Sequence, residues 1–235
     1  MSFIRAEDLV VEFPIYGARS RSLKNTVIRA ATGGVLATDA AQRTVVRAID
    51  HLSFDWKEGD RIGLVGHNGS GKTTLLRAVG GIYEPVGGSL SVHGRVASML
   101  SLTLGMDDYA TGYENIFIRG TILGLTRREI ARMVDEICEF SELGDFINMP
   151  MRTYSSGMSM RLAFTISTSV KADIILMDEW IGVGDEAFSE KAQRRLAELV
   201  GQAKILVLAS HSPDIIRANC NKVVRLDHGR IVDEI

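Results

Sequence analysis

Hydrophobic and polar positions follow two different spacings along this chain. Some segments alternate, or form short apolar runs, as half-buried and fully buried strands do. The strands predicted in this way are residues 9–13, 48–56, 61–65, 89–94, 173–177 and 204–209, and a final hairpin of residues 223–226 and 230–233 that turns at residues 227–229.

Other segments repeat with the spacing of a helix. Residues 74–79 and 159–168 show this pattern, and Thr126 and Glu129 form a capping box before a third helical stretch. The apolar stripe of that stretch, which we expect to be core, consists of Ile130, Met133, Val134, Ile137 and Phe140. Because strands alternate with helices, the sequence predicts an α/β fold with a largely parallel sheet and a helical insertion.

The composition is that of a globular protein without a strong charge bias. The chain has 235 residues, 46% of them hydrophobic, and a formal net charge of −2, so no basic field indicates nucleic acid as a partner. Cys138 and Cys220 have no metal-like spacing and are expected to be free thiols. No apolar run approaches the roughly 20 residues of a membrane-spanning helix. We therefore expect a cytosolic chain that reaches a membrane only through a partner.

A basic segment separates the first two predicted strands. Residues 17–43 carry several cations, and Leu23, Val27 and Ile28 would share one face of a short helix. Two interpretations stay open for this segment. It is either a solvated surface helix or a helix that faces a membrane or a partner protein.

The most specific motif is Gly66-His-Asn-Gly-Ser-Gly-Lys-Thr73, which matches the phosphate-loop pattern at every fixed position. Its glycines allow the backbone to wrap around a polyphosphate with successive amide N–H groups pointing inward. Lys72 adds a mobile positive charge for the β- and γ-phosphates, and the Thr73 hydroxyl can ligate Mg²⁺. The sequence therefore predicts binding of a nucleoside triphosphate.

Polar side chains follow two of the apolar strands. Asp178 and Glu179 come directly after residues 174–177, so both carboxylates are expected at the sheet edge where the phosphate loop lies. Asp178 is expected to hold Mg²⁺, directly or through water, and Glu179 to orient and deprotonate the attacking water. His211 follows residues 204–209, where an imidazole can sense and stabilise the γ-phosphate.

A Ser-Gly pair precedes the helical pattern of residues 159–168, in the motif Tyr154-Ser-Ser-Gly-Met158. Two interpretations are open here as well. Ser155 is either a simple N-cap, or part of a helix start whose free amides and dipole contact a second anion.

Taken in order, these motifs resemble those of the nucleotide-binding subunits of ABC transporters, and the resemblance covers essentially the entire chain. It implies the ABC ATPase fold, a P-loop NTPase core of mostly parallel sheet with an antiparallel β subdomain and a helical insertion. The implied single domain has a nucleotide-binding core of residues 1–98 and 170–235. Residues 99–169 would be the helical subdomain that carries the signature, and residues 17–43 an N-terminal insertion near the membrane or the permease.

The resemblance also implies roles for single residues. Lys72, Glu179 and His211 would be catalytic, and Thr73 and Asp178 would hold Mg²⁺, the latter through water. The residues implied to bind ATP are Gly66, His67, Asn68, Gly69, Ser70, Gly71, Lys72, Thr73 and Thr74 of the phosphate loop, Ser155, Ser156 and Gly157 of the family signature, and Asp185 of the D-loop. Phe13 and Tyr16 are both candidates for the aromatic residue that stacks on adenine.

The details resemble one branch of the family, the ATPases that export O-antigen, teichoic acid or capsule polysaccharide. Tyr154–Met158 replaces the usual Leu-Ser-Gly-Gly-Gln, and residues 98–112 contain no glutamine for the Q-loop, Ser101 or Leu102 falling near its place. The implied function is ATP hydrolysis that powers translocation of a lipid-linked polysaccharide. The implied partners are a second copy of the chain, with ATP at the interface, and an integral-membrane permease. The chain itself would lie at the cytoplasmic face of the inner membrane, bound there through the permease.

Two alternatives stay open. The chain could be the ATPase of another ABC transporter, either an importer or a small-molecule exporter. It could also be a soluble, nucleotide-gated regulatory ABC protein.

Overall fold

The computed structural model describes residues 1–15, 35–38, 44–180 and 186–234, which form two compact units. Unit 1 comprises Met1–Val96, Asp173–Trp180 and Lys204–Ile235. Unit 2 comprises Ala97–Ala172 and Ile181–Ala203. Most of the predicted insertion at residues 17–43, including Leu23, Val27 and Ile28, lies outside the described residues.

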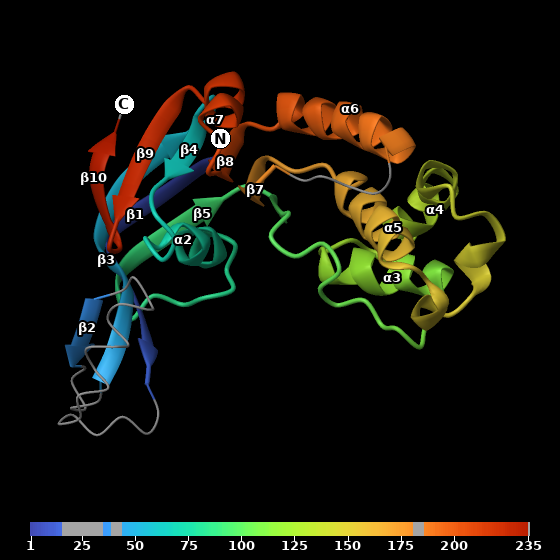
Figure 1. Ribbon diagram of the computed structural model, residues 1–235, viewed down its shortest axis with the longest axis horizontal. Helices are drawn as coiled ribbons and strands as arrows, with labels where there is room; N and C mark the ends of the chain where they lie inside the picture. Colours follow the sequence, from blue (N-terminus) through green and yellow to red (C-terminus); the bar gives the residue numbers. More distant parts are fainter. Residues whose placement is uncertain (16–34, 39–43, 181–185, 235) are drawn as a thin grey trace. The chain divides into compact units, whose positions relative to one another are not determined.

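Unit 1 contains an antiparallel sheet in which long strands alternate between buried and exposed side chains. In β3, for example, Leu52, Phe54 and Trp56 are buried while the residues between them are exposed. The strand order is β2-β3-β1-β5, with bounds Val35–Thr38, Thr44–Lys57, Phe3–Pro14 and Gly87–His93 (Figure 1). The predicted strands 9–13 and 48–56 are confirmed as parts of the longer β1 and β3.

The second sheet of unit 1 is mostly parallel. Its order is β10-β9-β4-β8-β7, and β6 (Val96–Ser98), which leads into unit 2, continues the order after β7. The central strands are buried along nearly their whole length, as strands covered on both faces are. Their bounds are Arg61–Val65 for β4, Ile174–Asp178 for β7, Ile205–Ala209 for β8, Lys222–Asp227 for β9 and Arg230–Glu234 for β10.

Parallel pairing sets where the strand ends meet. β4 pairs in parallel with β8 and with β9, and β7 pairs in parallel with β8, whereas β9 and β10 form the predicted antiparallel hairpin. The carboxyl ends of β4, β7 and β8 therefore lie at one edge of the sheet. The described part of this unit contains the helices α2 (Lys72–Val79) and α7 (Pro213–Asn219). The predicted α/β class, with a mostly parallel sheet and an antiparallel β part, is confirmed.

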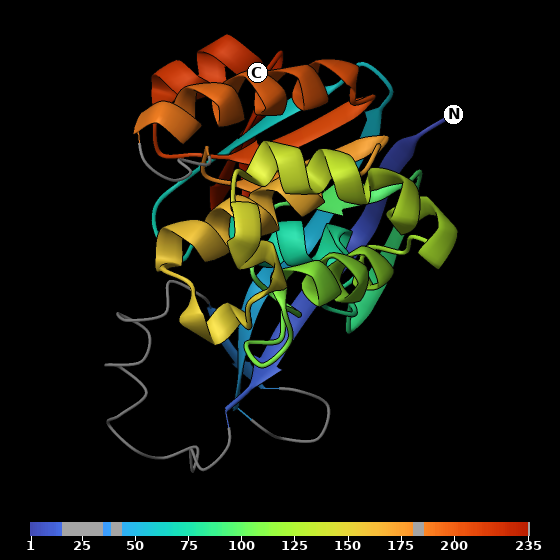
Figure 2. The ribbon, with the colours of Figure 1, turned by 90° about the vertical axis from the view of Figure 1, so that its right-hand side faces the viewer.

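Unit 2 is helical, and its first three helices lie against one another in Figures 1 and 2. They are α3 (Gly112–Ile122), α4 (Arg127–Ser141) and α5 (Ser156–Thr168), with two short 3-10 turns, η1 (Gly144–Asn148) and η2 (Met151–Thr153), between α4 and α5. The predicted capping box of Thr126 and Glu129 is confirmed at the start of α4. Ile130 and Ile137 of α4 share a buried core with Leu162 of α5.

Helix α6 (Glu186–Gln202) also belongs to unit 2, although the sequence grouped its residues with the core range 170–235. The physical reason is an aromatic cluster. Phe188 of α6 is 1% exposed and packs edge-on against Phe140 and Phe164, at ring-centroid distances of 5.7 and 6.3 Å. Lys191 and Arg195 of α6 lie over the Phe140 ring, at 4.4 and 4.3 Å from its centroid. The helical unit therefore consists of two stretches of chain.

Candidate functional site

The phosphate loop joins the end of β4 to the start of α2. Its backbone φ is +151° at Gly66, +82° at Gly69 and +109° at Gly71, a region that residues with a Cβ rarely adopt. A Cβ at Gly66 would lie 2.3 Å from the carbonyl oxygen of Leu226, and one at Gly71 would lie 2.7 Å from that of Ala48. The loop thus lies directly on the backbone of β9 and β3, and this path requires glycine.

The buried side chain of Lys72 folds back against the loop. Its Nζ donates to the carbonyl oxygens of Gly66, at 2.8 Å, and His67, at 3.0 Å. Burial lowers the pKa of Lys72, and the carboxylates of Asp178 and Glu179 offset part of that shift. A polyphosphate in the loop would offer this ammonium group anionic acceptors in place of two neutral ones.

The two residues predicted to hold Mg²⁺ lie in contact. The Thr73 hydroxyl, at the start of α2, donates to Oδ2 of Asp178, at the end of β7, over 2.6 Å. A hydroxyl and a carboxylate are the oxygen donors that a hard cation prefers. The chemistry of this donor pair therefore fits Mg²⁺.

Glu179 is held at both carboxylate oxygens. Its Oε2 accepts a hydrogen bond from the Ser210 hydroxyl (2.8 Å), and its Oε1 accepts one from the backbone N–H of His211 (2.9 Å). Its own N–H donates to the Ala209 carbonyl at 2.8 Å. The backbone φ of Glu179 is +74°, in the left-handed region, which is costly for a residue with a Cβ and is most common at functional sites.

These side chains surround a cavity of about 360 Å³ in unit 1. The lining residues that the sequence predicted are Asn68, Gly69, Gly71, Lys72, Thr73, Thr74, Asp178, Glu179 and His211. Val46 and Ala48 of β3 also line the cavity and were not predicted. Their spacing of two residues was an available signal, since such residues face the same side of a strand.

Several predicted residues of unit 1 do not line this cavity. Gly66 packs on β9, and Ser70 is fully buried, with a hydroxyl that has no hydrogen-bond partner among the described residues. His67 turns toward Asp227, and Phe13 packs edge-on against Tyr83, at a centroid distance of 5.0 Å. Tyr16 and Asp185 lie outside the described residues, so the adenine-stacking and D-loop roles stay predictions.

The signature residues lie in unit 2, at the start of α5. Ser155 is the N-cap of that helix, and its Oγ accepts a hydrogen bond from the Met158 N–H at 3.2 Å. Ser156 is exposed, and among the described residues only the Ser155 hydroxyl lies within 4 Å of the side-chain position of Gly157. The N-cap interpretation is confirmed, and the contact to a second anion stays a prediction.

A buried arginine holds the segment that lacks the Q-loop glutamine. Arg119 is 4% exposed, and its guanidinium donates to the carbonyl oxygens of Leu104 and, at 3.3 Å, of Ser101. Burial lowers the pKa of this side chain. Leu102 is buried, whereas Ser101 is exposed. Arg119 therefore anchors this segment within unit 2.

The fold and the loop geometry define the class: a P-loop protein with an attached helical unit. A family model described as "ABC transporter" matches residues 49–182. The chain belongs to the ABC transporter family. None of the helices in the described part of the chain has the length and apolar character to cross a membrane.

Relatives with high sequence identity are ATP-binding proteins of polysaccharide export systems. The O-antigen export system ATP-binding protein RfbE of Yersinia enterocolitica is 43% identical over 100% of this chain and 98% of its own length. The teichoic acids export ATP-binding protein TagH of Staphylococcus epidermidis is 35% identical over 97% of this chain and 82% of its own length. A solved structure of a dimeric ATP-binding cassette bound to ADP and Pi has a TM-score of 0.69 at 16% identity, covering 99% of this chain and 97% of that one.

Proposed function

We propose that this chain is the ATP-hydrolysing subunit of an ABC exporter that moves a lipid-linked, O-antigen-like polysaccharide across the cytoplasmic membrane. The observation that carries the proposal is that the phosphate loop, Asp178, Glu179 and His211 line one cavity together. The cargo class is supported by the names of the relatives, which are ATP-binding proteins of O-antigen and teichoic acid export.

The first task of the site is to bind the triphosphate. The amides of Asn68 to Thr73 and the Lys72 ammonium group would bind the β- and γ-phosphates, and the Thr73 and Asp178 oxygens would hold Mg²⁺. When bound, Mg²⁺ neutralises charge on the phosphate oxygens. Val46 and Ala48 supply an apolar wall that would shield one side of the bound nucleotide.

The second task is to direct water at the γ-phosphorus. Glu179 would accept a proton from that water, and its two hydrogen bonds to the end of β8 fix the direction of the carboxylate. The imidazole of His211, which follows Ser210 in the chain, would donate a hydrogen bond to the γ-phosphate oxygens as charge develops on them. Proximity and electrostatic stabilisation together account for catalysis of phosphoryl transfer to water.

The third part of the proposal concerns assembly. Two copies would face each other head to tail, so that Ser155 and Gly157 of one copy complete the phosphate site of the other. A separate permease would form the pore, with unit 2 passing on the motion, and the subunit would lie at the cytoplasmic face of the inner membrane. Residues 17–43 would lie near that membrane or permease. Nucleic acid has no part in this function, in keeping with the net charge of −2.

The enzymatic part is tested by phosphate release from purified protein. Glu179→Gln should bind ATP and lose nearly all turnover, because the amide keeps the shape but cannot take the proton. Glu58→Gln, which makes the same charge change at an exposed residue outside the cavity, should hydrolyse ATP at the wild-type rate. Brisk turnover by Glu179→Gln would contradict the role of the base.

The transport part is tested by affinity capture of tagged Glu179→Gln from detergent-solubilised native membranes with ATP. Recovery of a multi-spanning protein, followed by loss of a surface polysaccharide when its gene is deleted, is the expected result. A trapped dimer without a membrane partner would instead support the soluble regulatory alternative.

A further inference from the structure

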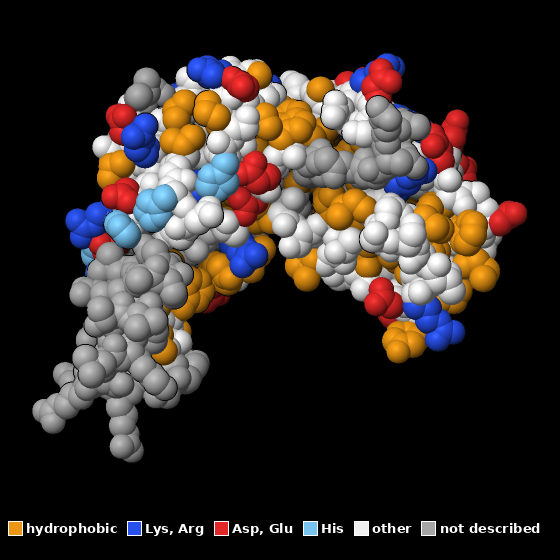
Figure 3. All heavy atoms as spheres, viewed as in Figure 1, with side chains coloured by type: hydrophobic (Ala, Val, Ile, Leu, Met, Phe, Trp, Pro, Cys, Tyr) orange, Lys and Arg blue, Asp and Glu red, His pale blue; other side chains and the backbone are white. Residues whose placement is uncertain are grey.

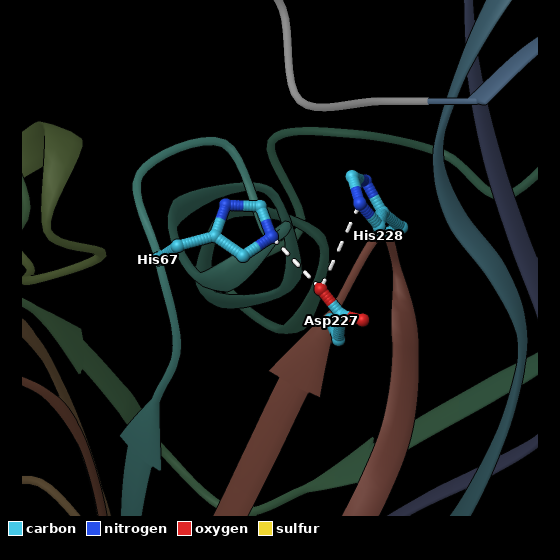
Figure 4. Close-up of side chains that lie close together, drawn as sticks. All are labelled: His67, Asp227 and His228. Carbon is cyan, nitrogen blue, oxygen red and sulfur yellow. Dashed lines mark hydrogen bonds and ion pairs between the residues drawn. The ribbon is translucent and has the colours of Figure 1, made fainter.

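Two histidines and an aspartate meet beside the phosphate loop, outside the cavity described above. His67 follows Gly66 in the loop, whereas Asp227 is the last residue of β9 and His228 follows it in the turn to β10. Their ligand atoms all lie within 4.8 Å of one another. In Figure 4 both imidazole rings face the Asp227 carboxylate, with Oδ1 at 2.9 Å from Nε2 of His67 and 3.8 Å from Nε2 of His228.

The three side chains are accessible to an ion from solvent. Those of His67, Asp227 and His228 are 45%, 49% and 57% exposed. Figure 3 shows histidine side chains gathered on this face of unit 1, close to acidic ones.

The hydrogen bonds of His67 provide a second, independent observation. Its Nδ1 lies 2.8 Å from the carbonyl oxygen of Asn68, and its Nε2 lies 2.9 Å from the carboxylate of Asp227. Both partners are acceptors, whereas a neutral imidazole has only one N–H to donate. A cation bound at Nε2 is one arrangement that satisfies both acceptors, since Nδ1–H then donates to the Asn68 carbonyl and the Asp227 carboxylate joins the ligands of the ion. Metal-bound histidines typically hold their other nitrogen in this way.

We propose that His67, Asp227 and His228 form a binding site for a divalent transition-metal ion of the Zn²⁺ class. Two imidazoles and one carboxylate are common ligands of such ions, whereas Mg²⁺ prefers an all-oxygen shell. Ligands that lie about 2.0–2.2 Å from a shared Zn²⁺ are at most about 4.4 Å apart, so a small rotation of exposed side chains closes the site.

A metal ion at this site would affect the phosphate loop, because His67 is part of that loop. The turn between β9 and β10 already contacts the phosphate loop, because the Gly229 N–H donates a hydrogen bond to the Ser70 carbonyl oxygen at 2.9 Å. A metal ion would add a link between the turn and His67, whose own carbonyl accepts a hydrogen bond from Lys72. Metal and nucleotide would then change each other's affinity by the same factor. The inference goes beyond the proposed function, since metal binding itself requires no ATP.

The test is a Zn²⁺ titration of the full chain against a chromophoric chelator, without nucleotide or Mg²⁺. Wild-type protein should bind one equivalent, and Asp227→Asn or His228→Gln should weaken binding by at least about tenfold. The double variant with His67→Gln and His228→Gln should lose the site. His51→Gln is the matched control, because His51 is another exposed histidine beside a carboxylate, 2.7 Å from Asp8, and it should bind Zn²⁺ as wild type does.

Two readouts guard against misfolded variants. Zn²⁺ should raise the midpoint of thermal unfolding of wild type and leave that of the double variant unchanged. In wild-type protein labelled at histidine, Zn²⁺ should shift the NMR signals of His67 and His228 alone. The proposal is overturned if wild type binds no Zn²⁺ at about 100 µM, if the double variant binds it equally well, or if other histidines respond instead. In any of these cases the His67–Asp227 contact is an ordinary hydrogen bond, and the proposed ATPase function is unaffected.

Discussion

The Ser210 hydroxyl donates to Oε2 of Glu179 over 2.8 Å, although the two residues are 31 positions apart in sequence. They meet because β7 and β8 are parallel neighbours, with Asp178 opposite Ala209 in register. Glu179 is the first residue after β7, and Ser210 is the first residue after β8. Ser210 is 3% exposed, so the donor itself is fixed by its surroundings.

Removal of that hydroxyl should slow hydrolysis and leave ATP binding intact. In Ser210→Ala the Glu179 carboxylate loses one of its two directing hydrogen bonds, and a bond to a charged group contributes about 1.5–3 kcal/mol. We expect kcat to fall by roughly 10- to 100-fold with little change in KM for ATP. Ser210→Thr keeps the hydroxyl and should recover most of the rate. An unchanged kcat in Ser210→Ala would show that the His211 N–H alone orients the carboxylate.

Gly71→Ala should abolish ATP binding, because the new Cβ meets both a positive φ and the carbonyl oxygen of Ala48 at 2.7 Å. Gly81→Ala is the matched control, since Gly81 also has a positive φ, +73°, but no atom in the described part of the chain lies within 4 Å of its side-chain position. We expect Gly81→Ala to lose about 1–2 kcal/mol of stability and to bind a fluorescent ATP analogue normally. Equal binding by both variants would mean that the loop tolerates a side chain at residue 71.

Ser155→Arg tests whether the phosphate site is shared between two copies. The added side chain would block the partner's nucleotide but not the loop of its own chain, so hydrolysis should be lost while monomers bind ATP normally. Thr121→Arg, an exposed neutral-to-cationic change elsewhere in unit 2, should hydrolyse ATP like wild type. Calorimetry on dilute monomers and phosphate release at high protein concentration separate the two effects. Weak ATP binding by Ser155→Arg monomers would contradict a site completed in trans.

Cys220 should react unusually slowly with thiol reagents. Burial raises its pKa to about 11, so at pH 8 the fraction of reactive thiolate is about 100-fold lower than for an ordinary cysteine. The alkylation rate should rise about tenfold per pH unit and level off only near pH 11. A Cys138→Ser variant isolates the signal, with urea-unfolded protein as the fast-reacting reference. A plateau near pH 9 in the folded protein would show that the thiol is not shielded.

The sequence pattern predicted those parts of the fold whose stabilising contacts lie between residues close together in the chain. The strand 61–65 was predicted with the bounds that it has, because an apolar run before a glycine loop needs no distant partner. The capping box at Thr126 is equally local, since both of its hydrogen bonds lie within one helical turn. The phosphate loop, Asp178 and Glu179 could be placed together because parallel strands bring their carboxyl ends to one edge.

Features set by distant partners were not predictable in the same way. Helix α6 joins unit 2 because Phe188 packs on Phe140 and Phe164, and no periodicity identifies those partners. His67 lies in the predicted motif, yet the direction of its ring depends on Asp227, 160 residues away. The motif thus located the loop but could not show which of its side chains leave the cavity.

The membership of α6 in unit 2 has a topological consequence. The chain crosses between the units four times, at residues 96–97, 172–173, 180–181 and 203–204. A chain from which residues 97–172 were deleted would still carry α6 but would lack Phe140 and Phe164, the rings on which Phe188 packs. The two units therefore cannot be separated by cutting the chain at one position. The third crossing comes only two residues after Glu179, whose backbone is already in the left-handed region. Only two peptide bonds of backbone therefore separate Glu179 from the point where the chain passes into the helical unit, a covalent connection that requires no side-chain contact.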